Sequence, residues 1–221
     1  MNIKPMPFDG LMVKALFDGR KTSMRIPVDQ EYVSSIEYVS SSDETNENID
    51  FLGLSYCSGI DDEGNTLEPE YRVYCTEYPE EGSIGIGQGV ARVGDLFYVQ
   101  EPCYVSSDYR LFRALDAVEV ERPSDQSWWK MLIGAVPVSD VPVWASRLTL
   151  KVTGVHIERI QHIKPSEAKT EGFNDWTGFA YDWTSRYAAG SGLSWSENPL
   201  VWVVSYEVIH QNVNEYLENQ K

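Results

Sequence analysis

Residues 9–25 read DGLMVKALFDGRKTSMR and predict a short helix that ends just before a cluster of cations and hydroxyls. Asp9 suits the N-cap position, because its carboxylate can accept from the free N–H groups of the first turn. Gly19 favours the left-handed conformation that ends a helix, which would hold the backbone of Lys21 and aim its ammonium group. Alternatively, the basic residues only neutralise the negative end of the helix. The apolar face is expected to contain Leu11, Met12, Ala15 and Leu16.

The rest of the chain predicts few helices and several separated strands. Strands are expected at residues 22–28, 32–39, 71–75, 96–101, 147–157 and 201–209, with a bulge at Gly154. Two further helices are expected at residues 165–171 and 176–187. This pattern favours an α+β fold, a small mixed β-barrel with flanking helices, in a single domain over residues 1–221. Residues 29–92 and 102–141 are expected to be irregular insertions.

The 221 residues carry a net charge of −16, which argues against binding nucleic acid by bulk attraction. Residues 41–81 contain twelve acids and one base, so this block holds −11 of that charge. The acidic block is interpreted as a solvated insertion or, alternatively, as a mimic of a phosphate array that binds a host protein. The remainder of the chain is close to balanced, which leaves room for a locally basic pocket.

Three widely spaced cysteines indicate neither a disulfide framework nor a zinc site, and a reducing cytoplasm is expected. The longest apolar run, residues 131–138, is far shorter than the ~20 residues that span a bilayer, so no membrane association is expected. Residues 1–8 lack the apolar core of a secretory signal. His156, His162 and His210 show no metal-ligand spacing, and no cofactor is predicted.

Four segments carry a family resemblance, namely GRKT at 19–22, GDLFYVQE at 94–101, PVWASR at 142–147 with EAKTEG at 167–172, and WSENPLVWVV at 195–204. In this order and spacing they resemble the ASCH domain, a branch of the PUA-like superfamily, and in particular its long bacteriophage and prophage members. The resemblance implies a curved β-barrel with a cleft between barrel and helices. It also implies recognition of RNA or modified bases.

One ASCH branch removes the acyl group of N4-acetylcytidine with a lysine, a threonine and a glutamate. The resemblance assigns the lysine to Lys21 and the glutamate to Glu171. The threonine position falls on Met24, whose thioether can neither attack a carbonyl nor relay a proton. Ser23 offers a hydroxyl instead, but it points to the opposite face of an extended chain from Met24 and Thr22.

Amide hydrolysis needs a nucleophile, a proton donor for the leaving amine and positive charge for the oxyanion. Lys21 suits the oxyanion, or acts as a base if burial lowers its pKa, and Glu171 suits an acid or a base. The two could equally form a structural ion pair. Glu101 is expected to pair with Arg25 or Arg147, or to accept from the exocyclic amine of a base.

Substrate contacts are predicted at Thr22, Arg25, Glu101, Trp144, Arg147 and Asn198. Trp144 and Trp202 are candidates for stacking on a base, although Trp202 alternates with Val204 and is typical of a core position. Asn198 also fits a turn into the last strand.

The leading hypothesis is recognition or processing of a modified nucleoside, with hydrolysis of an acylated cytosine as one reaction. The alternatives are a ribonuclease, a non-catalytic RNA-binding module, and an acidic phage protein that binds a host protein through residues 41–81. A ribonuclease would use Lys21 to stabilise charge on the phosphate and Glu171 as the base. The expected ligand is a nucleoside or a short single strand, in the cytoplasm of a bacterial cell or phage-infected host.

Overall fold

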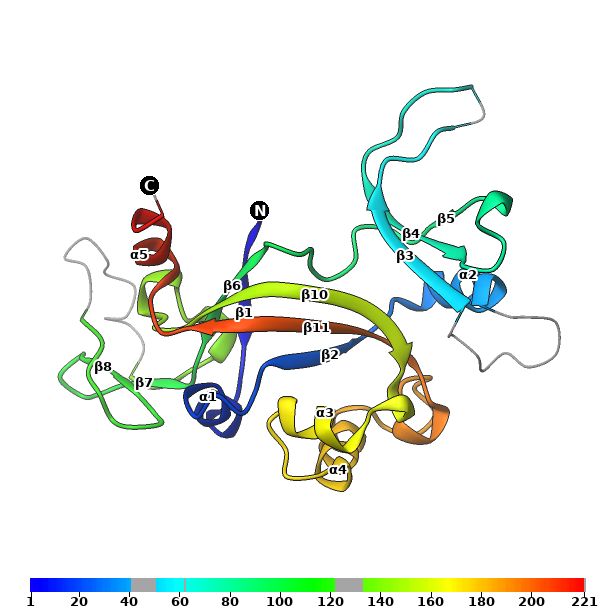
Figure 1. The fold of residues 1–221 in the computed structure, drawn as a ribbon. Coiled ribbons are helices and arrows are strands. Elements are labelled where there is room, and N and C mark those ends of the chain that lie inside the picture. The colour runs from blue at the N-terminus through cyan, green and yellow to red at the C-terminus, as the bar shows by residue number, and fades with distance from the viewer. Residues whose placement is uncertain (41–50, 62, 122–132, 221) are drawn as a thin grey trace.

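The computed structural model describes residues 1–40, 51–61, 63–121 and 133–220, and a five-stranded sheet forms its centre (Figure 1). The strand order is β1 (Ile3–Pro7), β6 (Leu96–Gln100), β10 (Thr149–Arg159), β11 (Leu200–Ile209) and β2 (Ser23–Pro27). β1 and β6 run parallel, and the other neighbours are antiparallel. The mixed α+β architecture is confirmed. Among the described residues this sheet stays open, with β1 and β2 as its edges, and no closed barrel is detected.

The long β10–β11 pair arches across the whole molecule (Figure 1). Its register shifts between Val152 and Gly154, where the bulge is expected. Successive side chains of a strand point to opposite faces, and both faces of β11 are covered. Val204 and Tyr206 pack with Val13 and Leu16 of α1 (Gly10–Phe17).

The opposite face of β11 carries α3 (Pro165–Thr170) and α4 (Trp176–Arg186). Val201 and Val203 pack there with Phe179 and Trp183 of α4. The continuous apolar run from Leu200 to Val204 follows from this two-sided burial, because both faces are covered over these residues.

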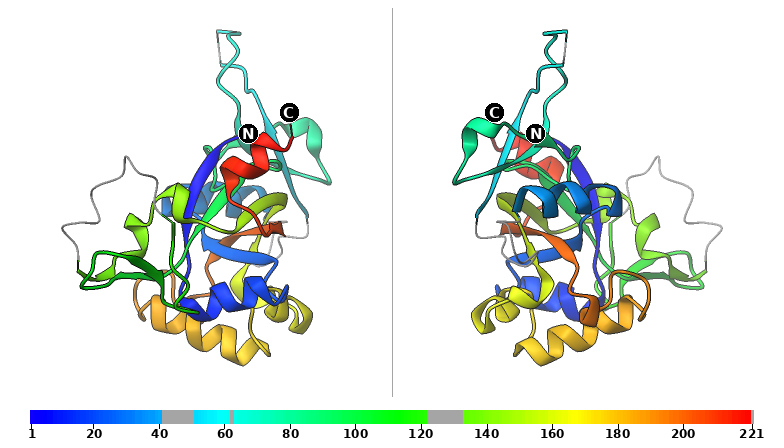
Figure 2. Two further views of the ribbon diagram at one scale, coloured as in Figure 1. Left: turned by 90° about the vertical axis from the view of Figure 1, so that its left-hand side faces the viewer. Right: turned by 90° about the vertical axis from the view of Figure 1, so that its right-hand side faces the viewer.

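One end of the sheet carries α2 (Gln30–Ser40), the hairpin of β3 (Leu52–Cys57) and β4 (Glu70–Cys75), and β5 (Ile84–Gly85). The hairpin rises from the body as an arm (Figure 2). The strand expected at residues 32–39 is wrong, because this segment belongs to α2. Tyr32, Val33, Ile36 and Val39 have helical spacing and join one cluster with Val73.

The opposite end carries a second small sheet of β7 (Cys103–Val105), β8 (Leu111–Arg113) and β9 (Gly134–Val136). It has a hydrophobic cluster of its own, so the expectation of a wholly irregular insertion at 102–141 is wrong. Residues 122–132, which include Trp128 and Trp129, lie outside the described residues, as do the acids at 41–50 and Asp62. The chain ends with α5 (Val213–Glu218).

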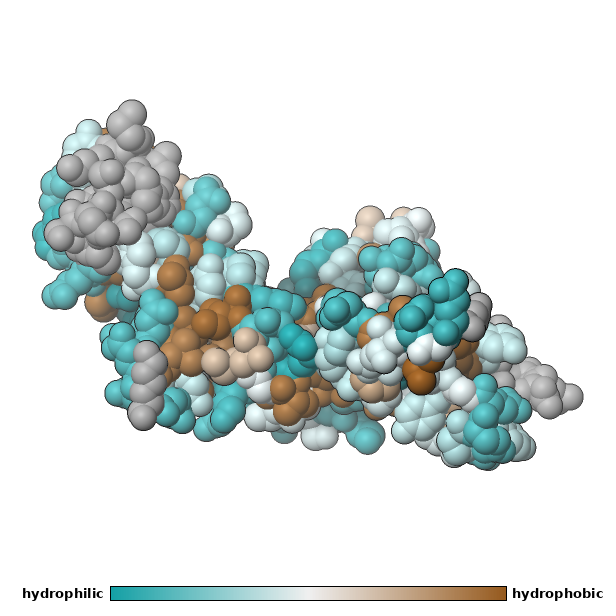
Figure 3. All heavy atoms as spheres, turned by 90° about the horizontal axis from the view of Figure 1, so that it is seen from above, coloured by the Kyte–Doolittle hydropathy of each residue, from teal (hydrophilic) through white to brown (hydrophobic). Residues whose placement is uncertain are grey.

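Seen from above, hydrophobic residues gather over the middle of the molecule, between more hydrophilic ends (Figure 3). In the described ranges, no helix combines the length and apolarity that a membrane span requires.

Candidate functional site

The end of α1 positions Lys21 much as the sequence predicts. Asp9 Oδ1 accepts from the backbone N–H of Met12 at 2.8 Å, and Gly19 adopts a φ of +67°. The backbone N–H of Lys21 then donates to the carbonyl of Ala15 at 3.1 Å. The predicted apolar face needs one correction, because Leu11 is 76% exposed and Val13 takes its place in the core.

Lys21 and Glu171 are brought together across the chain. The ammonium group of Lys21 donates to Glu171 Oε2 at 3.1 Å, to the carbonyl of Glu171 at 2.9 Å and to that of Ser23 at 3.0 Å. These three bonds use all three donors of the ammonium group. Each of the two charged side chains is 4% exposed, so the pair is buried.

Arg25 extends this pair into a buried network. Its Nη1 donates to Glu171 Oε1 at 3.0 Å, its Nη2 to Glu167 Oε2 at 2.8 Å and its Nε to Glu158 Oε1 at 2.8 Å. The side chain of Arg25 is 1% exposed. Its side-chain hydrogen bonds to described residues all go to glutamates, and its guanidinium carbon lies 5.9 Å from the ring centroid of Phe179. A contact between Arg25 and a substrate would therefore require the network to open.

Electrostatics stabilise the charged forms within this network. Burial alone would lower the pKa of Arg25, but the charges of Glu171 and Glu158 outweigh it and raise that pKa. Burial would raise the pKa of Glu158, yet hydrogen bonding from His156 and the charge of Arg25 lower it overall. Two cations thus face three carboxylates, which leaves a formal surplus of one negative charge.

β2 sends alternate side chains to opposite faces. Met24 belongs to the core cluster that holds α1, so it lies on the face away from the ion network. The hydroxyl of Ser23 lies 2.9 Å from that of Thr170, which itself donates to a backbone carbonyl at 2.8 Å. Ser23 is therefore near α3, as Lys21 and Arg25 are, but its hydroxyl bonds Thr170 and not a base. Thr22 pairs through its backbone, with its N–H donating to the carbonyl of Thr170 at 2.8 Å.

Glu101 lies in a second buried ion cluster. Its carboxylate accepts from Nε and Nη2 of Arg147, both at 2.8 Å, and from Nε of Arg113 at 3.0 Å. Of its two predicted partners, the structure shows Arg147. Arg25 pairs instead with Glu158, Glu167 and Glu171. The guanidinium carbon of Arg147 also lies 4.5 Å from the ring centroid of Phe17. No sequence motif singles out Arg113.

Both tryptophans predicted to stack on a base pack against other side chains of the fold. Trp144 packs against the cluster of the small β7–β9 lobe. Trp202 is 3% exposed and packs beside Tyr71, with ring centroids 5.0 Å apart. Asn198 has a φ of +50° and accepts from the backbone N–H of Gln161 at 3.0 Å, which confirms the turn before β11. A more accessible tryptophan, Trp176, is 49% exposed and lies elsewhere in the fold.

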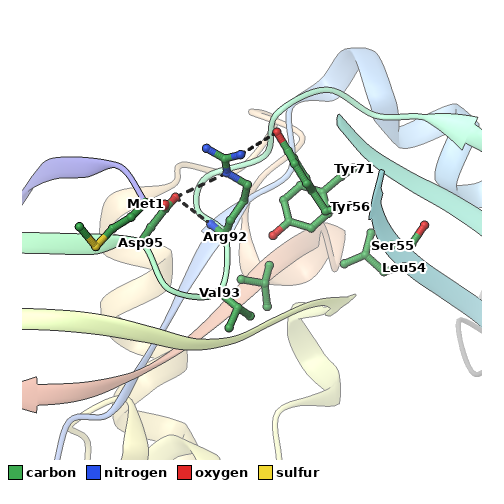
Figure 4. Close-up of a pocket in the computed structure, with 9 residues that line it drawn as sticks. Met1, Leu54, Ser55, Tyr56, Tyr71, Arg92, Val93 and Asp95 are labelled. Atoms are coloured by element: carbon green, nitrogen blue, oxygen red, sulfur yellow. Dashed lines mark hydrogen bonds and ion pairs between the residues drawn. The ribbon is translucent and has the colours of Figure 1, made fainter. Parts of the chain in front are cut away.

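A pocket of about 450 Å³ lies where the N-terminus, β3 and the loop before β6 meet β10 (Figure 4). Nη1 of Arg92 donates to the hydroxyl of Tyr56 at 3.0 Å, and the backbone N–H of Arg92 donates to Asp95 at 3.1 Å. No residue of the Lys21–Glu171 network lines this pocket. The sequence does not predict this pocket, because its walls come from five separate segments, which include Tyr71 of β4.

Within the described ranges, no group of three or more His, Cys, Asp or Glu residues is arranged to hold a metal ion. No family model, curated protein sequence or solved structure matches this chain.

Proposed function

We propose that this chain is a PUA-like protein of the ASCH type that recognises a modified nucleobase or nucleoside at the Lys21–Glu171 pair. The observation that carries the proposal is the 3.1 Å contact between these side chains, which come from the two motifs that resemble the ASCH lysine and glutamate. Ser23 lies near the same pair and supplies the hydroxyl that Met24 lacks.

The reaction we propose for this site is hydrolysis of an N4-acyl amide of cytosine. Water adds to the acyl carbon, the bond from that carbon to N4 breaks, N4 leaves with a proton, and the acyl group leaves as a carboxylate. If the Ser23 hydroxyl adds first, N4 leaves in the same way and water then hydrolyses the acyl-serine ester to the carboxylate and the free hydroxyl. Lys21 would stabilise the oxyanion, because it carries a fixed positive charge in a water-poor site. The Glu171 carboxylate would take up the proton of the attacking hydroxyl only after the substrate displaces Lys21 or Arg25, because the hydrogen bonds from these two cations stabilise its charged form.

Substrate access requires the network to open. Lys21 and Glu171 are buried, and the N–H of Thr22 ties β2 to the end of α3 through the carbonyl of Thr170. A base that enters must replace the contacts that Lys21 makes with the Glu171 and Ser23 carbonyls. Recognition would therefore couple to a shift of α3 relative to β2.

The test is mass spectrometry of a panel of modified nucleosides, N4-acetylcytidine included, after incubation with wild type, Lys21→Ala and Glu171→Gln. We expect wild type to release the acyl group and each variant to lose at least about a hundredfold in rate. Lys14→Ala is the matched control, since Lys14 makes only an exposed pair with Asp18.

Thermal unfolding of each variant separates loss of chemistry from loss of fold. If a folded wild type neither converts nor binds any nucleoside of the panel, the proposal is wrong. Cleavage of an RNA substrate that depends on Lys21, without acyl release, would replace amide hydrolysis with the ribonuclease alternative.

A further inference from the structure

Trp176 and Trp195 border a pocket of about 430 Å³ at the start of α3, together with Gln161, Ile163 and Pro165. Trp176 is the first residue of α4, and Trp195 opens the short 3-10 helix η7 (Trp195–Glu197). Their ring centroids are 6.4 Å apart, and the ring planes are inclined by only 21°. Trp176 is 49% exposed, so the pocket has an aromatic wall that solvent can reach.

Trp195 is held in place before any ligand arrives. Nε2 of Gln161 donates to its carbonyl at 2.7 Å, and its ring packs edge-on against Phe179 at 6.1 Å. The indole N–H groups of Trp176 and Trp195 donate to no other described residue, which leaves both able to bond a ligand. A fixed aromatic surface loses little conformational entropy on binding, which favours stacking.

Three exposed side chains that can carry positive charge lie beside this pocket, although the protein as a whole is acidic. His162, Lys164 and Lys169 are all exposed. Lys164 reaches Glu167 only at 4.0 Å, and neither His162 nor Lys169 makes an ion pair with any residue that the structure describes. The two acids of the same segment, Glu167 and Glu171, are paired with Arg25 and Lys21. Asp175 and Glu197, next to the tryptophans, accept capping hydrogen bonds from Gly178 and Ser194. Positive charge next to open aromatic rings is the combination that binds single-stranded nucleic acids, through phosphate contacts and base stacking.

We infer that this pocket stacks an unpaired base of a single-stranded nucleic acid. α3 begins at the pocket with Pro165, and Glu171 follows its last residue. At 1.5 Å per residue, these six residues span about 9 Å, so one strand can reach both sites. The inference rests on the proposed function, and it extends the substrate from a free nucleoside to a strand that carries the modified base.

The test is titration of the full chain with short oligoadenylates of RNA and of DNA, followed by calorimetry and tryptophan fluorescence. Trp176→Ala should weaken binding at least about tenfold, which corresponds to ~1.4 kcal/mol. Trp176→Phe, which keeps a ring, should recover part of that loss. Tyr181→Ala is the matched control, because Tyr181 is 79% exposed on the same helix and does not line the pocket.

Equal affinity of Trp176→Ala and Tyr181→Ala for the oligonucleotides would overturn the inference. The inference would also be overturned if a proline-rich peptide binds at Trp176 and the oligonucleotides do not compete with it. If the protein binds the strand in a way that depends on Trp176 but does not act on nucleosides, the inference is supported and the proposed chemistry fails. If wild type turns over free nucleosides but binds no oligonucleotide, the proposed chemistry is supported and the inference is overturned.

Discussion

At the scale of the residue, burial and pairing decide which charged side chains hold the fold together. Arg25 pairs with three glutamates, and its side chain is 1% exposed. Arg186, on the surface of α4, pairs with Asp182 and lies over the rings of Trp183 and Tyr187. A buried charge that loses its partner stays unsolvated, so removing one member costs far more than at the surface.

Arg25→Met should lower the free energy of unfolding by about 3–5 kcal/mol, because three carboxylates would lose their shared cation and Lys21 would be the one buried counter-charge left among the described residues. Urea denaturation followed by circular dichroism measures this change. Arg186→Met, at a side chain that is 47% exposed, should cost less than about 1 kcal/mol. Similar losses in the two variants would show that the buried network contributes no more to stability than the surface pair of Arg186.

At the scale of the element, two glycines set the geometry that brings Lys21 to Glu171. Gly19 ends α1 with a φ of +67°, and Gly172 follows Glu171 with a φ of +94°. A Cβ on Gly19 would meet no atom within 4 Å, whereas a Cβ on Gly172 would lie 3.1 Å from that of Ala15. Both positions need the left-handed backbone, but only Gly172 also needs the space.

Gly19→Ala should therefore lower the free energy of unfolding by about 1–2 kcal/mol, through the left-handed backbone alone. Gly172→Ala should lower it by about 1–3 kcal/mol more, because its methyl group would press on α1 near the Cβ of Lys21. Paired urea denaturation curves of the two variants give the difference. An equal loss at both positions would mean that α1 moves aside without cost.

At the scale of the whole molecule, the acidic block cannot be removed as one piece. Tyr71 and Val73 of β4 are buried with Trp202 of the central sheet, so deleting residues 41–81 would open the core. The exposed acids can instead be neutralised without touching the core, and those chosen are Glu63, Glu68, Glu77, Glu80 and Glu81.

Changing these five glutamates to glutamine should leave the free energy of unfolding nearly unchanged, since surface substitutions usually stay within about 0.5 kcal/mol each. Val73→Ala should lower it by about 2 kcal/mol, because Val73 is fully buried. Co-purification of this five-glutamine variant, beside wild type, with a host DNA-binding protein then tests the mimicry hypothesis. Retention of that partner at full affinity would contradict mimicry by these acids.

Local signals in the sequence predicted much of the scaffold. The cap at Asp9, the stops at Gly19 and Gly172, the bulge near Gly154 and the helix at Pro165 are set by near neighbours, so they can be read from short windows. The strands β6, β10 and β11 were recognised from their apolar content. The short edge strand β1 was missed, because its pairing with β6 depends on residues about 90 positions away.

The sequence by itself determined the α+β class, the stop before Lys21 and the identity of the residues that carry charge. Only the tertiary structure decided their partners, because a charged side chain pairs with whatever the fold places beside it. It joined Lys21 to Glu171, gave Arg25 to three glutamates, and tied Glu101 to Arg147. The exposure of a side chain likewise depends on all the elements packed around it. The tertiary structure therefore decided that Trp202 is buried in the core and that Trp176 is exposed.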